Sequence, residues 1–277
     1  MFKRLLVVVA LLACTPGLPR GETLPHPDHA SKQVEYFVAK PEGVGPWPTI
    51  ILLHGHQPDP RPGAKGTEEA LQRFAKRGVV AVAVSMPGYG DSSGPPDFCG
   101  PFSQHAVSAV IAKLRSEGAI APGKLVLQGA SRGAMVAGLV AAHDTTVAGL
   151  ILVAGEYDLA ALAADSTATG IKAGMRHNLI AETGGSAAAV RERSVLGVAK
   201  DIRATTLILH GAADDRTDPR NAQKLANEIN RAGGSARVVI YPGMGHSIPL
   251  EKRREETEPF LAKLWGDQFK TSSEEKR

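Results

Sequence analysis

Cysteine is scarce in this chain of 277 residues, which contains only Cys14 and Cys99. If Cys14 is removed with a leader or carries a lipid, no intrachain disulfide can form. A disulfide-stabilised scaffold is therefore excluded, and a hydrophobic core must stabilise the fold. The chain also lacks a large excess of positive or negative residues, because its formal net charge is only +4. A net charge this small, spread evenly along the chain, argues against a nucleic-acid-binding surface.

The chain also has no apolar segment of membrane-spanning length. Residues 5–13 are uninterruptedly apolar, but this run is too short for a permanent transmembrane helix. No dinucleotide fingerprint is present, since Gly88, Gly90 and Gly94 lack the helix start that phosphate binding requires. We therefore expect no nucleotide, flavin or metal cofactor.

The remaining composition is that of a globular protein, with 43% hydrophobic and 22% charged residues. A basic segment at residues 2–4, followed by the apolar run, predicts a secretory signal over residues 1–13. Residues 11–14 resemble a bacterial lipobox, in which a lipidated Cys14 would tether the protein to a membrane; ordinary cleavage between residues 13 and 22 is the alternative. We expect a protein exported to the bacterial cell envelope or periplasm, with roughly 255 residues left for one large domain.

Residues 14–32 are rich in Pro, Gly and His without apolar periodicity, so we predict a flexible linker there. His26 and His29 have a spacing that a metal site could use, but no third ligand stands beside them. The predicted organisation is a signal at 1–13, a linker at 14–32, a globular domain at 33–268 and a disordered tail at 269–277.

Apolar segments alternate with helical patterns through the domain. Strands buried within a sheet are predicted at residues 49–53 and 205–209, and further strands at residues 34–38, 79–84, 125–127, 147–153 and 236–241. Helices are predicted at residues 68–77, 104–114, 134–142, 220–231 and 254–265. This alternation predicts an α/β fold with a mostly parallel, twisted sheet flanked by helices. The long connection at 159–203 predicts a small cap, in which Met175, His177 and Leu179 either line a pocket or pack the helices together.

Residues 125–135, LVLQGASRGAM, predict a strand, a sharp turn and a helix, with Ser131 in the turn. Gly129 and Gly133 flank the serine, because larger side chains in such a strained turn would collide with the adjoining strand and helix. The turn lifts the Ser131 hydroxyl clear of the sheet. Ser131 is therefore the candidate nucleophile.

Two later predicted strands also end in polar residues. Residues 205–209 precede an acidic cluster at 214–218, and residues 236–241 precede PGMGH, whose glycines can present His246 over the edge of the sheet. Open α/β sheets place their sites at the carboxyl ends of strands, so we expect Ser131, His246 and a carboxylate to meet there. In such a triad the carboxylate orients the imidazole, which accepts the serine proton.

These features give the chain a resemblance to the α/β-hydrolase superfamily. Within it, residues 34–264 are similar to the catalytic domains of prolyl-oligopeptidase-like and dienelactone-hydrolase-like proteins. The motifs that carry the resemblance are ILLHG at 51–55, GASRG at 129–133, residues 155–159, RERS at 191–194, ILHG at 208–211 and residues 241–246.

The resemblance implies the chain order nucleophile, acid, base, which Ser131, Asp214 and His246 follow. Asp214 is preferred because its offset from the end of its strand resembles the usual position of the acid. The other carboxylates are Asp215 as a rival, Asp218 as the expected cap of the next helix, and Glu156 and Asp158 as more remote alternatives.

The resemblance also implies an oxyanion hole built from two backbone N–H groups, those of His56 and of Arg132. Gly55 would let the His56 loop approach the reacting carbonyl closely. We expect His54 to organise this loop through hydrogen bonds and to take no part as a base.

The chain departs from its relatives in three ways. Peptidases of this group usually carry a further glycine where this chain has Ala134. They also carry a propeller ahead of the catalytic domain, and we expect none here because few residues precede the first predicted strand. Dienelactone hydrolases generally use cysteine where this chain has Ser131. The resemblance implies a serine hydrolase that cleaves a small carboxylic ester. A peptidase acting on short peptides and a non-catalytic binding protein are the alternatives.

Overall fold

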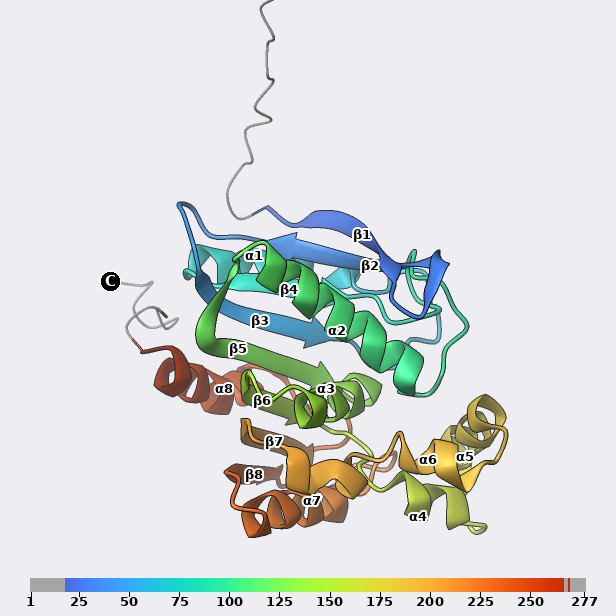
Figure 1. Ribbon diagram of the computed structural model, residues 1–277. Helices are drawn as coiled ribbons and strands as arrows, with labels where there is room; N and C mark the ends of the chain where they lie inside the picture. The colour runs from blue at the N-terminus through green and yellow to red at the C-terminus, as the bar shows by residue number, and fades with distance from the viewer. Residues whose placement is uncertain (1–17, 267–268, 270–277) are drawn as a thin grey trace, which may run out of the picture.

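The computed structural model describes residues 18–266 and 269. They form an eight-stranded sheet with the strand order β1-β2-β4-β3-β5-β6-β7-β8 (Figure 1). The strands are β1 (Arg20–His26), β2 (His29–Ala39), β3 (Trp47–Leu53), β4 (Val80–Val84), β5 (Ile120–Ala130), β6 (Val147–Val153), β7 (Thr205–Gly211) and β8 (Ala236–Tyr241).

Six neighbouring strands pair in parallel, namely β4, β3, β5, β6, β7 and β8. At one edge, β2 pairs antiparallel with β4, and β1 pairs antiparallel with β2. In the central strand β3, Ile51 pairs with Val82 of β4 and with Leu127 of β5. These three side chains are buried, and so are Ile50 and Val126 on the opposite face, as expected for a sheet covered on both sides. The predicted α/β fold is confirmed, and each strand predicted from the apolar segments matches an observed strand.

Helices cover both faces of the sheet (Figure 1). One face carries η1 (Lys65–Thr67), α1 (Glu68–Lys76) and α8 (Leu250–Trp265), and the other carries α2 (Pro101–Ser116), α3 (Arg132–His143) and α7 (Pro219–Arg231). Leu71 and Trp265 belong to the core cluster on the first face, and Ile111 and Leu225 belong to the cluster on the second. The sheet is therefore the middle layer of three.

Residues 159–203, predicted as a small cap, form α4 (Leu159–Ala164), α5 (Gly170–Thr183), α6 (Ala187–Arg191) and η2 (Val195–Asp201). Figure 1 shows α4, α5 and α6 beyond the carboxyl ends of the parallel strands. Leu179 is fully buried between helices, whereas His177 is exposed. Leu179 therefore packs the helices of the cap together and does not line an open pocket, which were the two roles that the sequence left open for it.

The prediction of a flexible linker at 14–32 is wrong where the structure describes it. β1 and β2 form an antiparallel hairpin, in which the Tyr36 hydroxyl donates a 2.5 Å hydrogen bond to Glu22. The ring of His26 stacks on Phe102 of α2, with centroids 3.6 Å apart. β1 is an edge strand with a mostly exposed, polar surface, so it lacks the apolar periodicity that would have revealed it. The domain therefore begins at β1; residues 14–17 lie outside the described part.

The start of the predicted tail also needs correction. Phe269 is buried and packs edge-to-face on Trp265, so it belongs to the core. Residues 270–277, the predicted signal at 1–13 and Cys14 lie outside the described residues.

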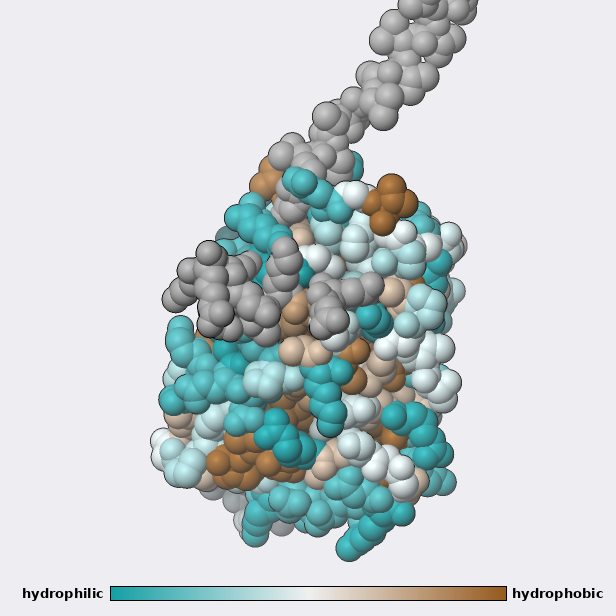
Figure 2. Space-filling view, turned by 90° about the vertical axis from the view of Figure 1, so that its left-hand side faces the viewer, coloured by the Kyte–Doolittle hydropathy of each residue, from teal (hydrophilic) through white to brown (hydrophobic). Residues whose placement is uncertain are grey.

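Hydrophilic residues cover much of the surface at the amino-terminal edge of the parallel strands, and hydrophobic residues gather in one larger area in the lower half of the view and in smaller areas elsewhere (Figure 2). The exposed large apolar side chains include Leu18, Val44, Ile171, Ile240 and Leu250. Within residues 18–266 and 269, no helix combines the length and apolarity that crossing a bilayer requires.

Candidate active site

Ser131 stands between the end of β5 and the start of α3, in a backbone conformation that few non-glycine residues adopt. Its φ is 52° and its ψ is −120°. Its N–H donates a 2.8 Å hydrogen bond to the Val153 carbonyl of β6, which ties the turn to the neighbouring strand. A strained residue held by its surroundings in this way is a common feature of functional sites. The predicted strand, sharp turn and helix are confirmed.

The two glycines around Ser131 are required by close backbone packing. A Cβ atom at Gly129 would lie 2.1 Å from the Gly133 carbonyl oxygen, and one at Gly133 would lie 2.2 Å from the Leu53 carbonyl oxygen. Both distances are far inside van der Waals contact. Helix α3 can therefore begin directly against β5 and β3, as the sequence motif predicted.

The loop after β3 lies beside the candidate nucleophile. A Cβ atom at Gly55 would lie 3.1 Å from the Ser131 Cβ atom. The His54 imidazole fixes the loop, because its Nδ1 lies 2.8 Å from the Gly55 carbonyl oxygen and its Nε2 accepts a hydrogen bond from Met86 N–H. Burial lowers the pKa of His54, which favours the neutral ring that this pattern needs. His54 is the loop organiser that was predicted.

The two residues predicted to supply oxyanion donors are Arg132, which follows Ser131 directly, and His56, which lies in the loop after β3. Arg132 is the first residue of α3, so its N–H is one of those that a helix cannot satisfy internally. His56 follows Gly55 in the loop, and its Nδ1 lies 2.9 Å from the Tyr89 hydroxyl. Burial and the Arg132 charge both lower the pKa of His56. Donation from His56 N–H and Arg132 N–H to a reacting oxygen stays a prediction.

Asp214 and His246 are hydrogen bonded across the loops that follow β7 and β8. His246 Nδ1 lies 2.9 Å from Asp214 Oδ2. With Nδ1–H donated to the carboxylate, Nε2 is the ring nitrogen that can accept a proton. A Cβ atom at Gly211 would lie 2.2 Å from the Gly245 carbonyl oxygen, so β7 packs directly against the His246 loop. The link from His246 Nε2 to Ser131 Oγ stays a prediction.

The Asp214 carboxylate accepts further hydrogen bonds that the sequence did not reveal. His210 Nε2 lies 3.1 Å and Thr217 Oγ1 lies 2.7 Å from Oδ2, while the N–H groups of Arg216 and Thr217 donate to Oδ1. Burial would raise the pKa of Asp214, but the hydrogen bonds from His210, His246 and Thr217 outweigh it and hold this pKa well below its usual range. Asp214 therefore stays ionised beside His246.

His210 is the functional residue that the sequence interpretation missed. Its side chain is fully buried, so it contacts Asp214 from inside the protein. The signal for it in the sequence is its position at the end of β7, immediately before Gly211 and four residues before Asp214.

The other carboxylates have different roles. Asp218 caps α7, as predicted, by accepting a hydrogen bond from Arg220 N–H. Asp158 caps α4, and buried Glu156 accepts a hydrogen bond from the Asn221 side chain. Asp215 is exposed. His246 has its acidic hydrogen-bond partner in Asp214.

Arg132 connects the candidate nucleophile to the cap. Its guanidinium lies 4.2 Å above the centre of the Phe98 ring and 3.3 Å from Glu182 Oε1 of α5. Glu182 Oε2 is buried and makes no hydrogen bond to a described residue. Cys99 is buried beside them, donates to the Arg132 carbonyl, and has its pKa raised to about 12 by burial. This thiol is unsuited to act as a nucleophile.

In the part of the chain that the structure describes, no group of three or more His, Cys, Asp or Glu side chains could hold a metal ion. His26 and His29 belong to the hairpin of β1 and β2.

Comparison with known proteins identifies the chain's relatives. The sequence profile of the prolyl oligopeptidase family matches residues 103–271, and that of the X-Pro dipeptidyl-peptidases of the S15 family matches residues 32–171. None of the curated proteins compared with the chain matches it.

Three solved structures illustrate the likeness in fold. A puromycin-hydrolysing peptidase of Mycobacterium tuberculosis has 21% identity and a TM-score of 0.72, over 93% of this chain and 41% of the other. An acetyl xylan esterase from Paenibacillus sp. R4 has 16% identity and a TM-score of 0.68, over 88% of each chain. Thermogutta terrifontis esterase 2, phosphonylated by sarin, has 18% identity and a TM-score of 0.71, over 93% of this chain and 99% of the other.

The chain thus spans about two fifths of the length of the peptidase and nearly the full length of the two esterases. All three share its α/β-hydrolase fold. Since the first family profile matches more than half of the sequence, the chain belongs to the prolyl oligopeptidase family of serine hydrolases.

Proposed function

We propose that the protein hydrolyses a small carboxylic ester through an acyl-enzyme formed on Ser131. The observation that carries this proposal is the 2.9 Å hydrogen bond between His246 and Asp214, at the same sheet edge as the strained Ser131 turn. It fixes the imidazole tautomer that a serine hydrolase needs.

In the proposed reaction, His246 Nε2 takes the proton from Ser131 Oγ as the oxygen attacks the acyl carbonyl. Asp214 stabilises the imidazolium, and the N–H groups of His56 and Arg132 stabilise the tetrahedral oxyanion. The C–O bond to the alcohol then breaks, and His246 returns the proton to the leaving oxygen. Water, activated by the same imidazole, attacks the acyl-enzyme and releases the acid and free Ser131.

An ester is preferred because the chain matches esterases over nearly their whole length. A peptidase is the second candidate, because both matching family profiles are named for peptidases.

A substrate panel tests the proposal. Chromogenic esters graded by acyl length and aminoacyl nitroanilides are assayed with the wild type, with Ser131→Ala, and with Ser247→Ala as the control. Ser247 is exposed beside His246. We expect turnover of short-chain esters that falls by about 10⁵-fold or more in Ser131→Ala and changes less than about threefold in Ser247→Ala.

The outcomes separate the alternatives. Faster cleavage of aminoacyl nitroanilides than of every ester would identify a peptidase. Ligand binding without turnover in the wild type would identify a binding protein and contradict the proposal.

We also infer export from residues 1–13, with either a lipid at Cys14 or ordinary signal cleavage. Mass spectrometry of the mature amino terminus tests this inference. A lipidated cysteine as first residue supports the membrane tether, an unmodified start within residues 14–22 supports simple cleavage, and an intact Met1 in the native host contradicts export.

A further inference from the structure

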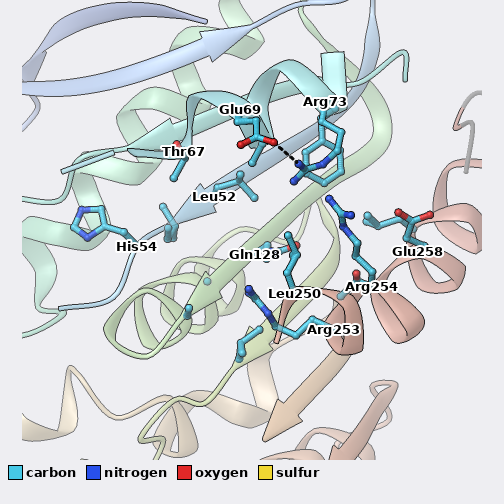
Figure 3. Close-up of a pocket in the computed structure, with 18 of the residues that line it drawn as sticks. Leu52, His54, Thr67, Glu69, Arg73, Gln128, Leu250, Arg253, Arg254 and Glu258 are labelled. Atoms are coloured by element: carbon cyan, nitrogen blue, oxygen red, sulfur yellow. Dashed lines mark ion pairs between the residues drawn. The ribbon is translucent and has the colours of Figure 1, made fainter. Parts of the chain in front are cut away.

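A cavity of about 410 Å³ lies between α1 and α8, on the face of the sheet opposite α2, α3 and α7 (Figure 3). This volume is in the range of about 300–1,000 Å³ that is typical of small-molecule sites. Ser131, Asp214 and His246 are not among its described lining residues. The apolar part of the lining comes from the sheet and both helices and includes Leu52, Phe74, Val153, Leu250 and Leu261.

Arginine side chains converge on this cavity from the two helices, Arg73 from α1 and Arg253 and Arg254 from α8 (Figure 3). A further lining arginine, Arg77, differs from them because its guanidinium forms two 3.1 Å hydrogen bonds with Glu258. The other three therefore set the charge of the cavity.

The described carboxylates near these three arginines offset their charge only in part. Glu69 is 3.8 Å from Arg73, but its side chain is 94% exposed, so the pair is weak. Within residues 18–266 and 269, Arg253 and Arg254 have no carboxylate within 4.0 Å. The Arg253 Nε atom is buried and makes no hydrogen bond to a described residue.

Burial and the nearby Arg254 charge lower the pKa of Arg253, while Tyr241 and Glu251 raise it in part; burial and Arg254 lower the pKa of Arg73, while Glu69 and Glu258 raise it in part. Arginine nevertheless remains protonated at neutral pH. Positive charges kept in such a setting are costly unless an anion pairs with them.

We propose that this cavity binds an organic anion, whose carboxylate or phosphate group pairs with Arg253 and Arg254 and whose apolar part packs against Leu52 and Phe74. Guanidinium groups match the geometry of both oxyanions through paired hydrogen bonds. The Gln128 side chain, which projects from β5 into the cavity, offers an additional polar contact (Figure 3). The site does not depend on the proposed ester hydrolysis.

Calorimetry and thermal unfolding test the site directly. The probes are hexanoate, hexyl phosphate, inorganic phosphate and hexan-1-ol. We expect at least one of the two hexyl anions to raise Tm by roughly 2–5 °C at saturation, and hexan-1-ol to have no effect. A preference for hexanoate or hexyl phosphate would identify the head group.

The matched variants are the double variant Arg253→Gln with Arg254→Gln, and Lys252→Gln. Lys252 lies on the same helix, but its side chain pairs with Glu255 outside the cavity. We expect the double variant to bind at least tenfold more weakly, and Lys252→Gln to bind within about twofold of the wild type. The double variant should unfold at an equal or higher temperature without ligand, because it removes two neighbouring, partly buried charges of the same sign.

Three outcomes would overturn the proposal. The first is that neither hexyl anion binds. The second is that the double variant binds a hexyl anion as tightly as the wild type, which would place the ligand elsewhere, including in the catalytic site. The third is equally tight binding of inorganic phosphate, which would exclude a role for the apolar wall. If the double variant does not fold, Arg254→Gln alone must show at least threefold weaker binding than Lys252→Gln.

Discussion

Ser131 and Asp214 occupy the same edge of the sheet, but different forces hold them there. The Ser131 turn is fixed by sterics, since a Cβ atom at either flanking glycine would lie within 2.2 Å of a backbone oxygen. Asp214 is fixed by donors, namely His210, His246, Thr217 and backbone N–H groups. Substitutions near Ser131 should therefore act first on folding, whereas substitutions around Asp214 should act first on activity.

The largest effect on activity outside the nucleophile is expected at Asp214. In Asp214→Asn the carboxamide cannot stabilise the His246 imidazolium, so we predict a fall in kcat of about 10⁴-fold. Ester turnover at neutral pH measures it, with exposed Asp215→Asn as the control, for which we expect less than about a twofold change. Equal losses in both variants would show that the assignment of the acid is wrong.

The largest effect on stability is expected at the glycines that flank Ser131. In Gly133→Ala the new methyl group meets the Leu53 carbonyl oxygen, so we predict a loss of at least about 3 kcal/mol in the free energy of unfolding. Urea denaturation measures it. The control is Gly174→Ala in α5, where a Cβ atom meets nothing within 4 Å and the change should stabilise the helix slightly. Similar unfolding energies for the two variants would refute the steric account.

A smaller effect is expected at His210, which acts on catalysis only through Asp214. His210→Phe removes a donor to the carboxylate, and we predict a fall in kcat of about tenfold with little change in KM. His210→Gln, whose amide can donate the same hydrogen bond, should recover most of the activity. A change confined to KM, or no recovery with glutamine, would argue against this positioning role.

The smallest effect is a pH dependence of stability. The pKa of Asp214 is lower in the folded protein than the value of about 3.9 in an unfolded chain, so the stabilisation is present above that value and is lost as the pH falls toward the folded pKa. We predict that the free energy of unfolding declines more steeply below about pH 4 for the wild type than for Asp214→Asn. Parallel curves in urea titrations would contradict the predicted sign of this dependence.

The sequence predicted the Ser131 turn better than the hydrogen bonds around Asp214. The requirement for Gly129 is local, because the colliding atom is the Gly133 carbonyl oxygen of the same turn, whereas a Cβ atom at Gly133 meets the Leu53 carbonyl oxygen of β3 and this glycine was predictable because the whole motif is recognisable in the sequence. The contact of His210 with Asp214 depends on how the chain after β7 folds back, which no spacing rule encodes. For the same reason, the acid could be chosen from the sequence only by its resemblance to relatives.

β8, a half-buried edge strand, was predictable from its β-branched residues 238–240, and the other predicted strands were predictable because their apolar segments are buried within the sheet. β1 was not, because an edge strand paired on one side and exposed on the other retains a polar sequence. The arginines of α8 gave no signal either. Arg253 and Arg254 look like ordinary surface charges in the sequence until α1 is placed opposite them.

The central claim is that Ser131 is a nucleophile activated by His246. Labelling with a fluorophosphonate, followed by peptide mapping, tests it most directly. We predict a single adduct on Ser131 in the wild type and at least about 100-fold slower labelling in His246→Gln. An adduct on another residue, or labelling of Ser131 at an unchanged rate in His246→Gln, would contradict the account.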